Sequence, residues 1–383
     1  MQSLSVRRHP SDFTTRLIAT IMAIGLLLVP TTAVASTGDP AQAAAGWLAE
    51  ELVDGERLVG SWTDSEGRVN EFDDHGGTAD VVFALSAAQV AAPQIRTATD
   101  WLIAEAGMYT GEAFGALSAG ATAKLALALM TDGRDPRSVG GDLIAALQDL
   151  EVTEGADAGR FSDAGDDDWS STISQALAIL ALERAEGVSA SSESIAYLAD
   201  QQCTDGGFPF SFSPGECVDA TAIDGPTAID ATLIVIQALI ATGHDVAEAL
   251  AWLDARFADD GWGNANTAGL AAVAYGLSGR AGDADQARDF ILELQDGCDG
   301  DATGAIAYNA AGEGDPVFAT RQAILGLTGQ GYLTVTSQGA SQSAPRLDCS
   351  ASNPTVIIVA AVGLGLLAVG IVVLVARRRK AAA

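Results

Sequence analysis

The sequence predicts an all-α protein of six helical hairpins, and a repeated pattern is the main reason. Each repeat has an amphipathic helix, an Asp/Gly-rich loop and a second helix that is almost wholly apolar. The first helices carry Trp47-Leu48, Trp101-Leu102, Ala146-Leu147, Tyr197-Leu198, Trp252-Leu253 and Phe290-Ile291, and the second helices end near Leu85, Leu129, Leu182, Leu239, Leu277 and Leu327. One hairpin cannot bury its own apolar side, so stacked hairpins must share a core.

The two helices of a repeat differ in where their apolar residues fall. In residues 245–257 the charged side chains lie largely away from the face that carries the apolar ones. That apolar face consists of Val246, Leu250, Leu253 and Phe257. Residues 232–240 are apolar nearly all round, which is typical of a helix enclosed on most sides. An outer ring of amphipathic helices around an inner ring of apolar helices satisfies both patterns. Six hairpins can also be arranged as an open solenoid.

Proline and glycine mark the joints between these helices. Pro93 and Pro136 open the second and third outer helices, and Pro226 and Pro316 precede the fourth and sixth inner helices. The spacing between successive inner helices varies, which indicates variable loops on a constant core. Binding residues are expected in such loops.

The N-terminus has the form of a secretory signal peptide. Arg7, Arg8 and Arg16 precede an apolar run, and Ala33-Val34-Ala35 matches a small-x-small cleavage site. We expect residues 1–35 to be removed. The paired arginines also fit the twin-arginine route, but the following residues favour general secretion.

The C-terminus predicts a membrane anchor. Residues 356–375 carry no charge, and Arg377-Arg378-Arg379-Lys380 follows at once. Such a length spans a bilayer as a helix, and the basic cluster belongs on the cytoplasmic side. We expect a single-pass cell-membrane protein with a transmembrane helix at 354–376, a cytoplasmic tail at 377–383 and an extracellular domain at 39–332. Residues 333–353 are rich in Ser, Thr and Gln, which predicts a flexible stalk.

Acidic residues dominate the chain, with 50 Asp and Glu against 20 Lys and Arg. Without the signal peptide and the basic tail, the net charge is about −36. This charge repels nucleic acid and anionic lipid, and it permits cationic or neutral ligands. A solvated surface in a saline medium explains the same composition.

Four cysteines occur in a chain with only three histidines. No Cys-x-x-Cys pair is present, so a zinc site is poorly supported, and an even number of cysteines in an exported domain favours disulfides. Three pairings are possible. We expect one bond between Cys203 and Cys217 within repeat four, and one between Cys298 and Cys349.

Several loop and helix motifs resemble a known repeat family. Gln202-Cys-Thr-Asp-Gly-Gly-Phe208 is similar to the Gln-x-x-Asp-Gly-Gly-Trp motif of the prenyltransferase and squalene-oxidase repeats, and Asp259-Asp-Gly-Trp-Gly263 is a shorter copy. Asp230-Ala-Thr232 resembles the start of that family's inner helices. The resemblance covers the folded domain and implies an (α/α)6 toroid. Function is less specified, because members include cyclases, prenyltransferase subunits, thioester domains and cobalamin carriers.

The chemistries of these members require residues that can be sought here. A cyclase needs an Asp-x-Asp-Asp acid, and the nearest candidates are Asp166, Asp167 and Asp168 before the third inner helix. We favour helix capping for these carboxylates, with cation binding or catalysis as alternatives. The prenyltransferase zinc set and the thioester motif cannot be assembled. We therefore expect no catalytic residues and no tightly bound cofactor.

We therefore expect the protein to bind a ligand without catalysing a reaction. Aromatic residues in the loops suit a large, flat or sugar-like ligand: Trp62, Trp169, Phe210, Phe212, Trp262 and Tyr308. For Trp262 and for Phe208, bracing of the hairpins is the favoured role. The cobalamin carriers imply a corrinoid ligand and a partner, either a transporter or a second binding subunit. Calcium in loops 163–168 and 296–301 is a further possibility.

The sequence thus predicts an exported, membrane-anchored surface protein that binds a small molecule. A terpenoid cyclase-like enzyme and a structural or adhesive module are the alternatives.

Overall fold

A computed structural model describes residues 36–349, apart from 139–140, 213–216 and 299–301. The expected signal peptide, transmembrane helix and basic tail lie outside the described residues. Among the helices of the described part, none has the length and apolarity needed to cross a bilayer.

The described residues are mostly helical, with 14 α-helices and few strands, which confirms the all-α class. Six of these helices are the apolar ones: α3 (His75–Ala87), α6 (Ala119–Thr131), α8 (Thr172–Arg184), α11 (Thr227–Ala241), α13 (Ala265–Leu277) and α15 (Pro316–Thr328). Six others are peripheral: α2 (Pro40–Glu50), α4 (Ala92–Ala104), α7 (Leu143–Asp149), α9 (Ser192–Ala199), α12 (Ala247–Asp260) and α14 (Ala281–Glu293). The short pieces are α5 (Ala106–Thr110), α10 (Ala220–Asp224) and a 3-10 helix at Glu112–Phe114.

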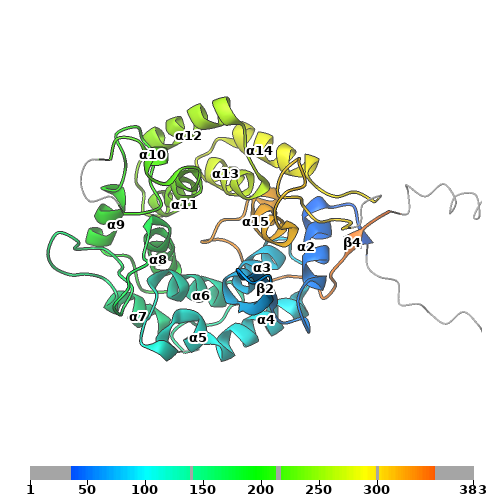
Figure 1. The fold of residues 1–383 in the computed structure, drawn as a ribbon, viewed down its shortest axis with the longest axis horizontal. Coiled ribbons are helices and arrows are strands. Elements are labelled where there is room, and N and C mark those ends of the chain that lie inside the picture. The colour runs from blue at the N-terminus through cyan, green and yellow to red at the C-terminus, as the bar shows by residue number, and fades with distance from the viewer. Residues whose placement is uncertain (1–35, 139–140, 213–216, 299–301, 350–383) are drawn as a thin grey trace, which may run out of the picture. The chain divides into compact units, whose positions relative to one another are not determined.

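The six apolar helices contact one another in chain order. The α3 helix contacts α6, and contacts continue through α8, α11, α13 and α15. The α15 helix in turn contacts α3, so the succession returns to its start, and the peripheral helices lie outside it (Figure 1).

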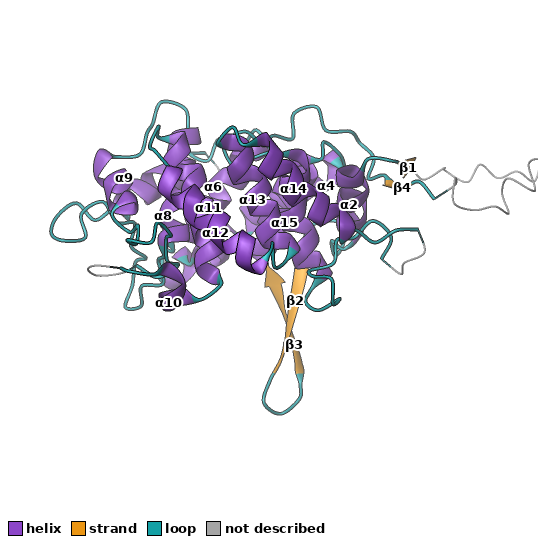
Figure 2. Cartoon of the chain, turned by 90° about the horizontal axis from the view of Figure 1, so that it is seen from above, coloured by secondary structure: helices purple, strands orange, loops and turns teal. Residues whose placement is uncertain are grey.

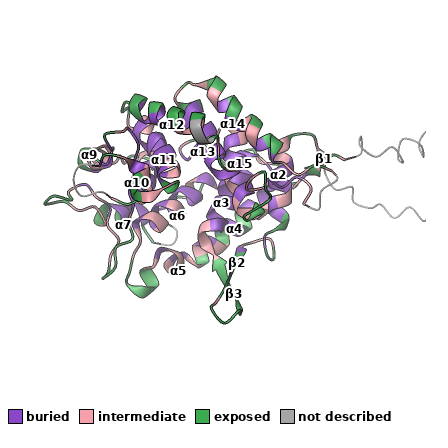
Figure 3. Cartoon of the chain, turned by 45° about the horizontal axis from the view of Figure 1, so that its top comes forward, coloured by how far each residue is buried: buried purple, intermediate pink, exposed green. Residues whose placement is uncertain are grey.

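Burial follows the two sequence patterns. Every residue of α3 from Gly77 to Ala87 is buried, whereas α4 buries one face only (Figure 3). Side-chain caps begin many of the helices. Ser171, for example, caps α8 in a reciprocal pair with Ser174, which satisfies backbone N–H groups that the helix leaves free.

Loops are attached to the apolar helices by a recurring hydrogen bond. Near the start of four of the six apolar helices, a buried Thr or Gln accepts from the backbone N–H of a residue in the preceding connecting segment. The four pairs are Thr78 with Leu58 (3.0 Å), Gln175 with Phe161 (2.8 Å), Thr232 with Phe208 (2.8 Å) and Thr320 with Ile306 (2.9 Å). Each bond satisfies a buried donor and fixes the distance between loop and helix.

The Asp-Gly-Gly motif at 205–207 also has a structural role. The Asp205 carboxylate accepts from the Trp252 indole N–H at 2.6 Å. A Cβ atom on Gly207 would lie 2.5 Å from the Trp252 ring, so only glycine fits there. This motif therefore braces α12 against the loop before α11, and the fully buried Phe208 belongs to the same brace.

The segment after α15 packs against the helices, which differs from the expected flexible stalk. Its Tyr332 and Val335 are buried, and their carbonyls accept from the Arg184 guanidinium. Further on, β4 (Arg346–Leu347) pairs in parallel with β1 (Ser36–Thr37). We call residues 331–347 the C-terminal strap. Its backbone N–H groups bond to carbonyls at helix ends, from Ser337 to Thr131 and from Ser341 to Gln89.

Both expected disulfides are present. Cys203 and Cys217 have Cα atoms 4.5 Å apart, and Cys298 and Cys349 have Cα atoms 5.5 Å apart. The second bond fixes the end of the described chain to the loop after α14.

A β-hairpin, which the sequence pattern did not indicate, projects from the helices (Figure 2). Its strands are β2 (Leu58–Thr63) and β3 (Val69–Asp74), which pair antiparallel. The Phe72 ring covers Gly60, where a Cβ atom would lie 2.4 Å from it.

Candidate functional site

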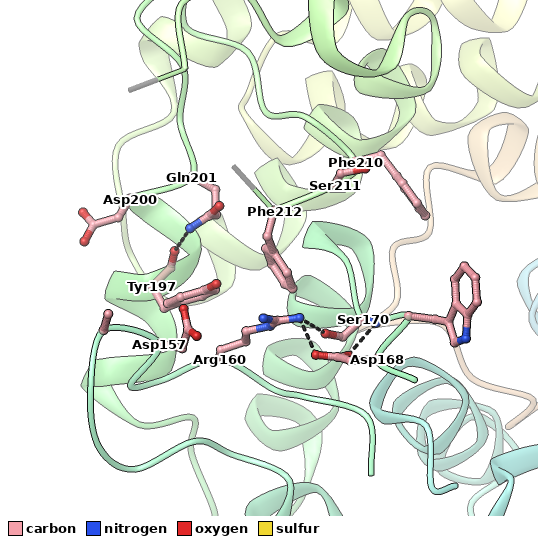
Figure 4. Close-up of a pocket in the computed structure, with 12 residues that line it drawn as sticks. Asp157, Arg160, Asp168, Ser170, Tyr197, Asp200, Gln201, Phe210, Ser211 and Phe212 are labelled. Atoms are coloured by element: carbon pink, nitrogen blue, oxygen red, sulfur yellow. Dashed lines mark hydrogen bonds and ion pairs between the residues drawn. The ribbon is translucent and has the colours of Figure 1, made fainter. Parts of the chain in front are cut away.

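Three of the six predicted ligand-binding aromatics line one cavity of about 870 Å³. These are Trp169, Phe210 and Phe212. They come from two different connecting segments, one before α8 and one before α11. Tyr197, on α9, also lines the cavity (Figure 4).

The other three predicted aromatics lie elsewhere. Trp62 is on the projecting hairpin and is 55% exposed. Trp262 packs against Phe257, with ring centroids 4.5 Å apart, which fits the bracing role. Tyr308 lies 6.3 Å from the Phe318 ring.

Hydrogen bonds hold the Phe210 segment against α8. The hydroxyl of Thr172 donates to the Pro209 carbonyl at 2.5 Å, and its backbone N–H donates to the Phe210 carbonyl at 3.0 Å. Ser211 donates to the Asp224 carboxylate through both its N–H and its hydroxyl, each at 2.9 Å. The segment is therefore fixed from both sides, and its two phenylalanines are presented to the cavity.

An ion pair between Arg160 and Asp168 forms the wall of the cavity (Figure 4). The same guanidinium donates to the Ser170 hydroxyl at 3.0 Å. It also lies over the Phe212 ring, 4.7 Å from the ring centroid, in a cation–π contact. The Phe212 ring meets Tyr197 edge-on at 5.3 Å, so aromatic and charged groups alternate along this wall.

The environment of Asp168 stabilises its carboxylate form. Partial burial acts to raise its pKa, but hydrogen bonds from Ser170 and Ser162 and from the Asp163 backbone outweigh this and lower the pKa to about 2. A general acid needs a pKa near the working pH. Asp168 is thus poorly suited to protonate an alkene.

The expected capping role of Asp166, Asp167 and Asp168 is wrong, because Ser171 is the N-cap of α8. Asp168 instead accepts from the backbone of its own loop. Ser171 sits at the position from which a side chain reaches the third helical N–H, and the carboxylates precede it by three residues or more.

Tyr197, Arg160, Asp157 and Asp200 also line the cavity and were not predicted. Burial raises the pKa of Tyr197, and the nearby Arg160 charge opposes this. Sequence patterns give no signal that joins α9 to the two loops. A search for polar residues in the same two repeats as Trp169 and Phe210 would have found them.

Metal binding finds no support in the described part of the chain, where no three His, Cys, Asp or Glu side chains are grouped to hold an ion. In loop 163–168, Asp163 accepts from the Ala119 N–H at 2.8 Å, so its carboxylate holds two loops together. Loop 296–301 lies partly outside the described residues, and calcium there stays a prediction.

A second acidic residue has an unusual environment. Asp230, in the first turn of α11, accepts from Thr267 at 2.7 Å and from Asn266 at 2.8 Å. Burial raises its pKa to about 6, although both hydrogen bonds act to lower it. The pKa of this carboxyl group is therefore raised, whereas that of Asp168 is lowered.

Comparison with known proteins identifies no relative: no family model, curated protein or solved structure matches this chain.

Proposed function

We propose that this chain is an exported, membrane-anchored protein of the cell surface that binds a small molecule in the cavity of Trp169, Phe210 and Phe212. The convergence of these three rings on one cavity carries the proposal. Its volume of about 870 Å³ lies in the range of small-molecule sites. Trp169 is 81% exposed, which leaves a large apolar surface available for contact.

The proposed scaffold is an (α/α)6 toroid spanning residues 39–332 and related to the prenyltransferase and squalene-oxidase repeats. Its support is the succession of helix contacts from α3 to α15 and back to α3, since an open solenoid leaves its first and last repeats apart. The motif at 202–208 adds to this support.

The proposed location is the outside of the cell membrane, with a single anchor at 354–376. Two disulfides favour an oxidising compartment. The proposed ligand is a corrinoid or another large, flat molecule, because its faces match the exposed rings. A transporter or a second binding subunit would then receive it.

The test is a binding titration on the full-length chain in detergent, with cyanocobalamin and a set of flat small molecules. Binding is expected to raise the melting temperature, and Trp169→Ala or Phe210→Ala should weaken it about tenfold or more. Trp62→Ala is the matched control, because it removes an exposed tryptophan from the hairpin. The proposal fails if the Trp62 variant loses as much affinity as the Trp169 variant, or if no ligand binds.

A second candidate, a terpenoid cyclase-like enzyme, is favoured by the raised pKa of Asp230. A carboxyl group that is partly protonated near neutral pH is a plausible proton donor. The discriminating assay is product formation from a linear isoprenoid. Loss of product in Asp230→Asn, but not in Asp168→Asn, would favour the enzyme over the binding protein. A structural or adhesive module is the third candidate, and it predicts neither ligand binding nor turnover.

A further inference from the structure

The cavity has an excess of negative charge, which bears on its ligand. Three carboxylates line it, from Asp157, Asp168 and Asp200, against one cation, Arg160. The Arg160 guanidinium is paired with Asp168. Neither Asp157 nor Asp200 forms a salt bridge with any described residue. Two negative charges at this cavity are therefore uncompensated.

The position of Asp200 is unfavourable for the helix that carries it. Asp200 is the C-cap of α9, where the free carbonyls already give the helix end a partial negative charge. The N-caps Asp39, Asp74, Asp142 and Asp315 accept backbone N–H groups and so stabilise their helices, whereas Glu51, Glu105 and Asp132 are, like Asp200, acidic C-caps. Helix stability thus gives no reason for an acidic residue at position 200.

One aromatic ring of the cavity already contacts a cationic side chain. The Phe212 ring holds the Arg160 guanidinium at 4.7 Å, while the Trp169 ring is mostly exposed. Tryptophan is the strongest side chain for cation–π contact. The exposed indole and the two uncompensated carboxylates line the same cavity, which therefore offers both groups that an organic cation requires.

We infer that the ligand of this cavity is an organic cation with a flat or aromatic body, held by the Trp169 ring and by the charges of Asp157 and Asp200. This inference rests on the proposed binding function. The acidic surface of the whole chain would also raise the local concentration of such a ligand.

The test compares three flat probes that differ in charge: 10-methylacridinium, neutral acridine and acridine-9-carboxylate. Fluorescence titrations of the full-length chain in detergent at neutral pH measure each affinity. The cation is expected to bind about tenfold more tightly than acridine, and the anion more weakly than both. Added salt should weaken binding of the cation and leave acridine unchanged.

Variants locate the effect. Asp157→Asn and Asp200→Asn should each weaken binding of 10-methylacridinium roughly two- to fivefold without changing the affinity for acridine. Asp289→Asn is the control, because it removes one exposed carboxylate from α14 at the same change in net charge. If Asp289→Asn weakens binding of 10-methylacridinium as much as the cavity variants do, the inference is overturned, because the effect then comes from the net charge of the whole chain.

The outcomes separate the inference from the proposed function. If acridine binds as tightly as 10-methylacridinium and depends on Trp169, the cavity binds ligands but has no preference for cations, and the inference fails alone. If no probe binding depends on Trp169, the proposed function fails for these ligands and the inference fails with it.

Discussion

Asp230 provides a pH-dependent test of how the start of α11 is built. Its pKa is raised to about 6, from an ordinary value of 3.8, mainly by burial. Between these two values the folded chain binds a proton that the unfolded chain releases, so stability falls as pH rises from 4 to 6. The full difference corresponds to about 3 kcal/mol, of which about 2 kcal/mol develops between about pH 4.5 and pH 7. The Asp230→Asn variant should lose this part of the pH dependence.

The assay is guanidinium unfolding of both proteins at the two pH values, followed by circular dichroism. The change in unfolding free energy from low to neutral pH is compared between them, because a hydrogen bond lost in the variant shifts both of its values alike. Wild type should lose about 2 kcal/mol more than Asp230→Asn on going to neutral pH. Equal pH dependence in the two proteins would refute the raised pKa and, with it, the support for Asp230 as a proton donor.

Three further substitutions test the packing. Gly46→Ala should destabilise by about 2 kcal/mol or more, because a Cβ atom would lie 1.7 Å from the Pro345 carbonyl oxygen; an unchanged melting temperature would contradict this. Arg184→Met should cost roughly 2–4 kcal/mol and speed hydrogen exchange in the C-terminal strap, because two carbonyls lose their donor. Thr232→Val should cost roughly 1–3 kcal/mol by orphaning the buried Phe208 N–H, and urea unfolding measures it.

Helix type was predictable because it depends on local pattern. The apolar segments at 176–182 and 232–240 lie within α8 and α11, where burial surrounds them on most sides. A run with no polar face has no alternative position in a soluble domain. The disulfide between Cys203 and Cys217 was likewise predictable, because both cysteines lie in the loop of repeat four. Once they are paired, Cys298 and Cys349 are the two cysteines left.

The C-terminal strap shows where composition fails. Its serines, threonines and glutamines resemble a linker, yet the backbone N–H of Ser337 donates to the Thr131 carbonyl and that of Ser341 to the Gln89 carbonyl. Helix C-termini leave carbonyls without partners, and the backbone N–H groups of a segment that packs against them can supply the donors. Amino-acid composition does not predict these hydrogen bonds, because it carries no information on which helix ends lie next to the segment. The partner that matters most, Arg184, lies far from the strap in sequence.

The candidate site was only half predictable for a related reason. Exposed aromatics such as Trp169 and Phe210 stand out in a sequence, because loops seldom need them for packing. The remaining groups depend on convergence: Arg160 matters because it meets Asp168 and the Phe212 ring at once. No local sequence pattern predicts that these three side chains come into contact.

The position of the cavity follows from the distribution of loop length. Among the described helices, the two longest intervals between successive apolar helices are those from α6 to α8 and from α8 to α11. One runs from the end of α6 to the start of α8 and the other from the end of α8 to the start of α11, and both contribute walls to the cavity. The bonds of Gln175 to Phe161 and of Thr232 to Phe208 each fix one point of these segments, and residues 168–170 and 210–212 beyond them line the cavity. Long segments with such fixed points are where a helical scaffold can acquire a binding site at little cost in stability. Shortening either segment between its fixed point and α8 or α11 should therefore abolish binding while leaving the helix content unchanged.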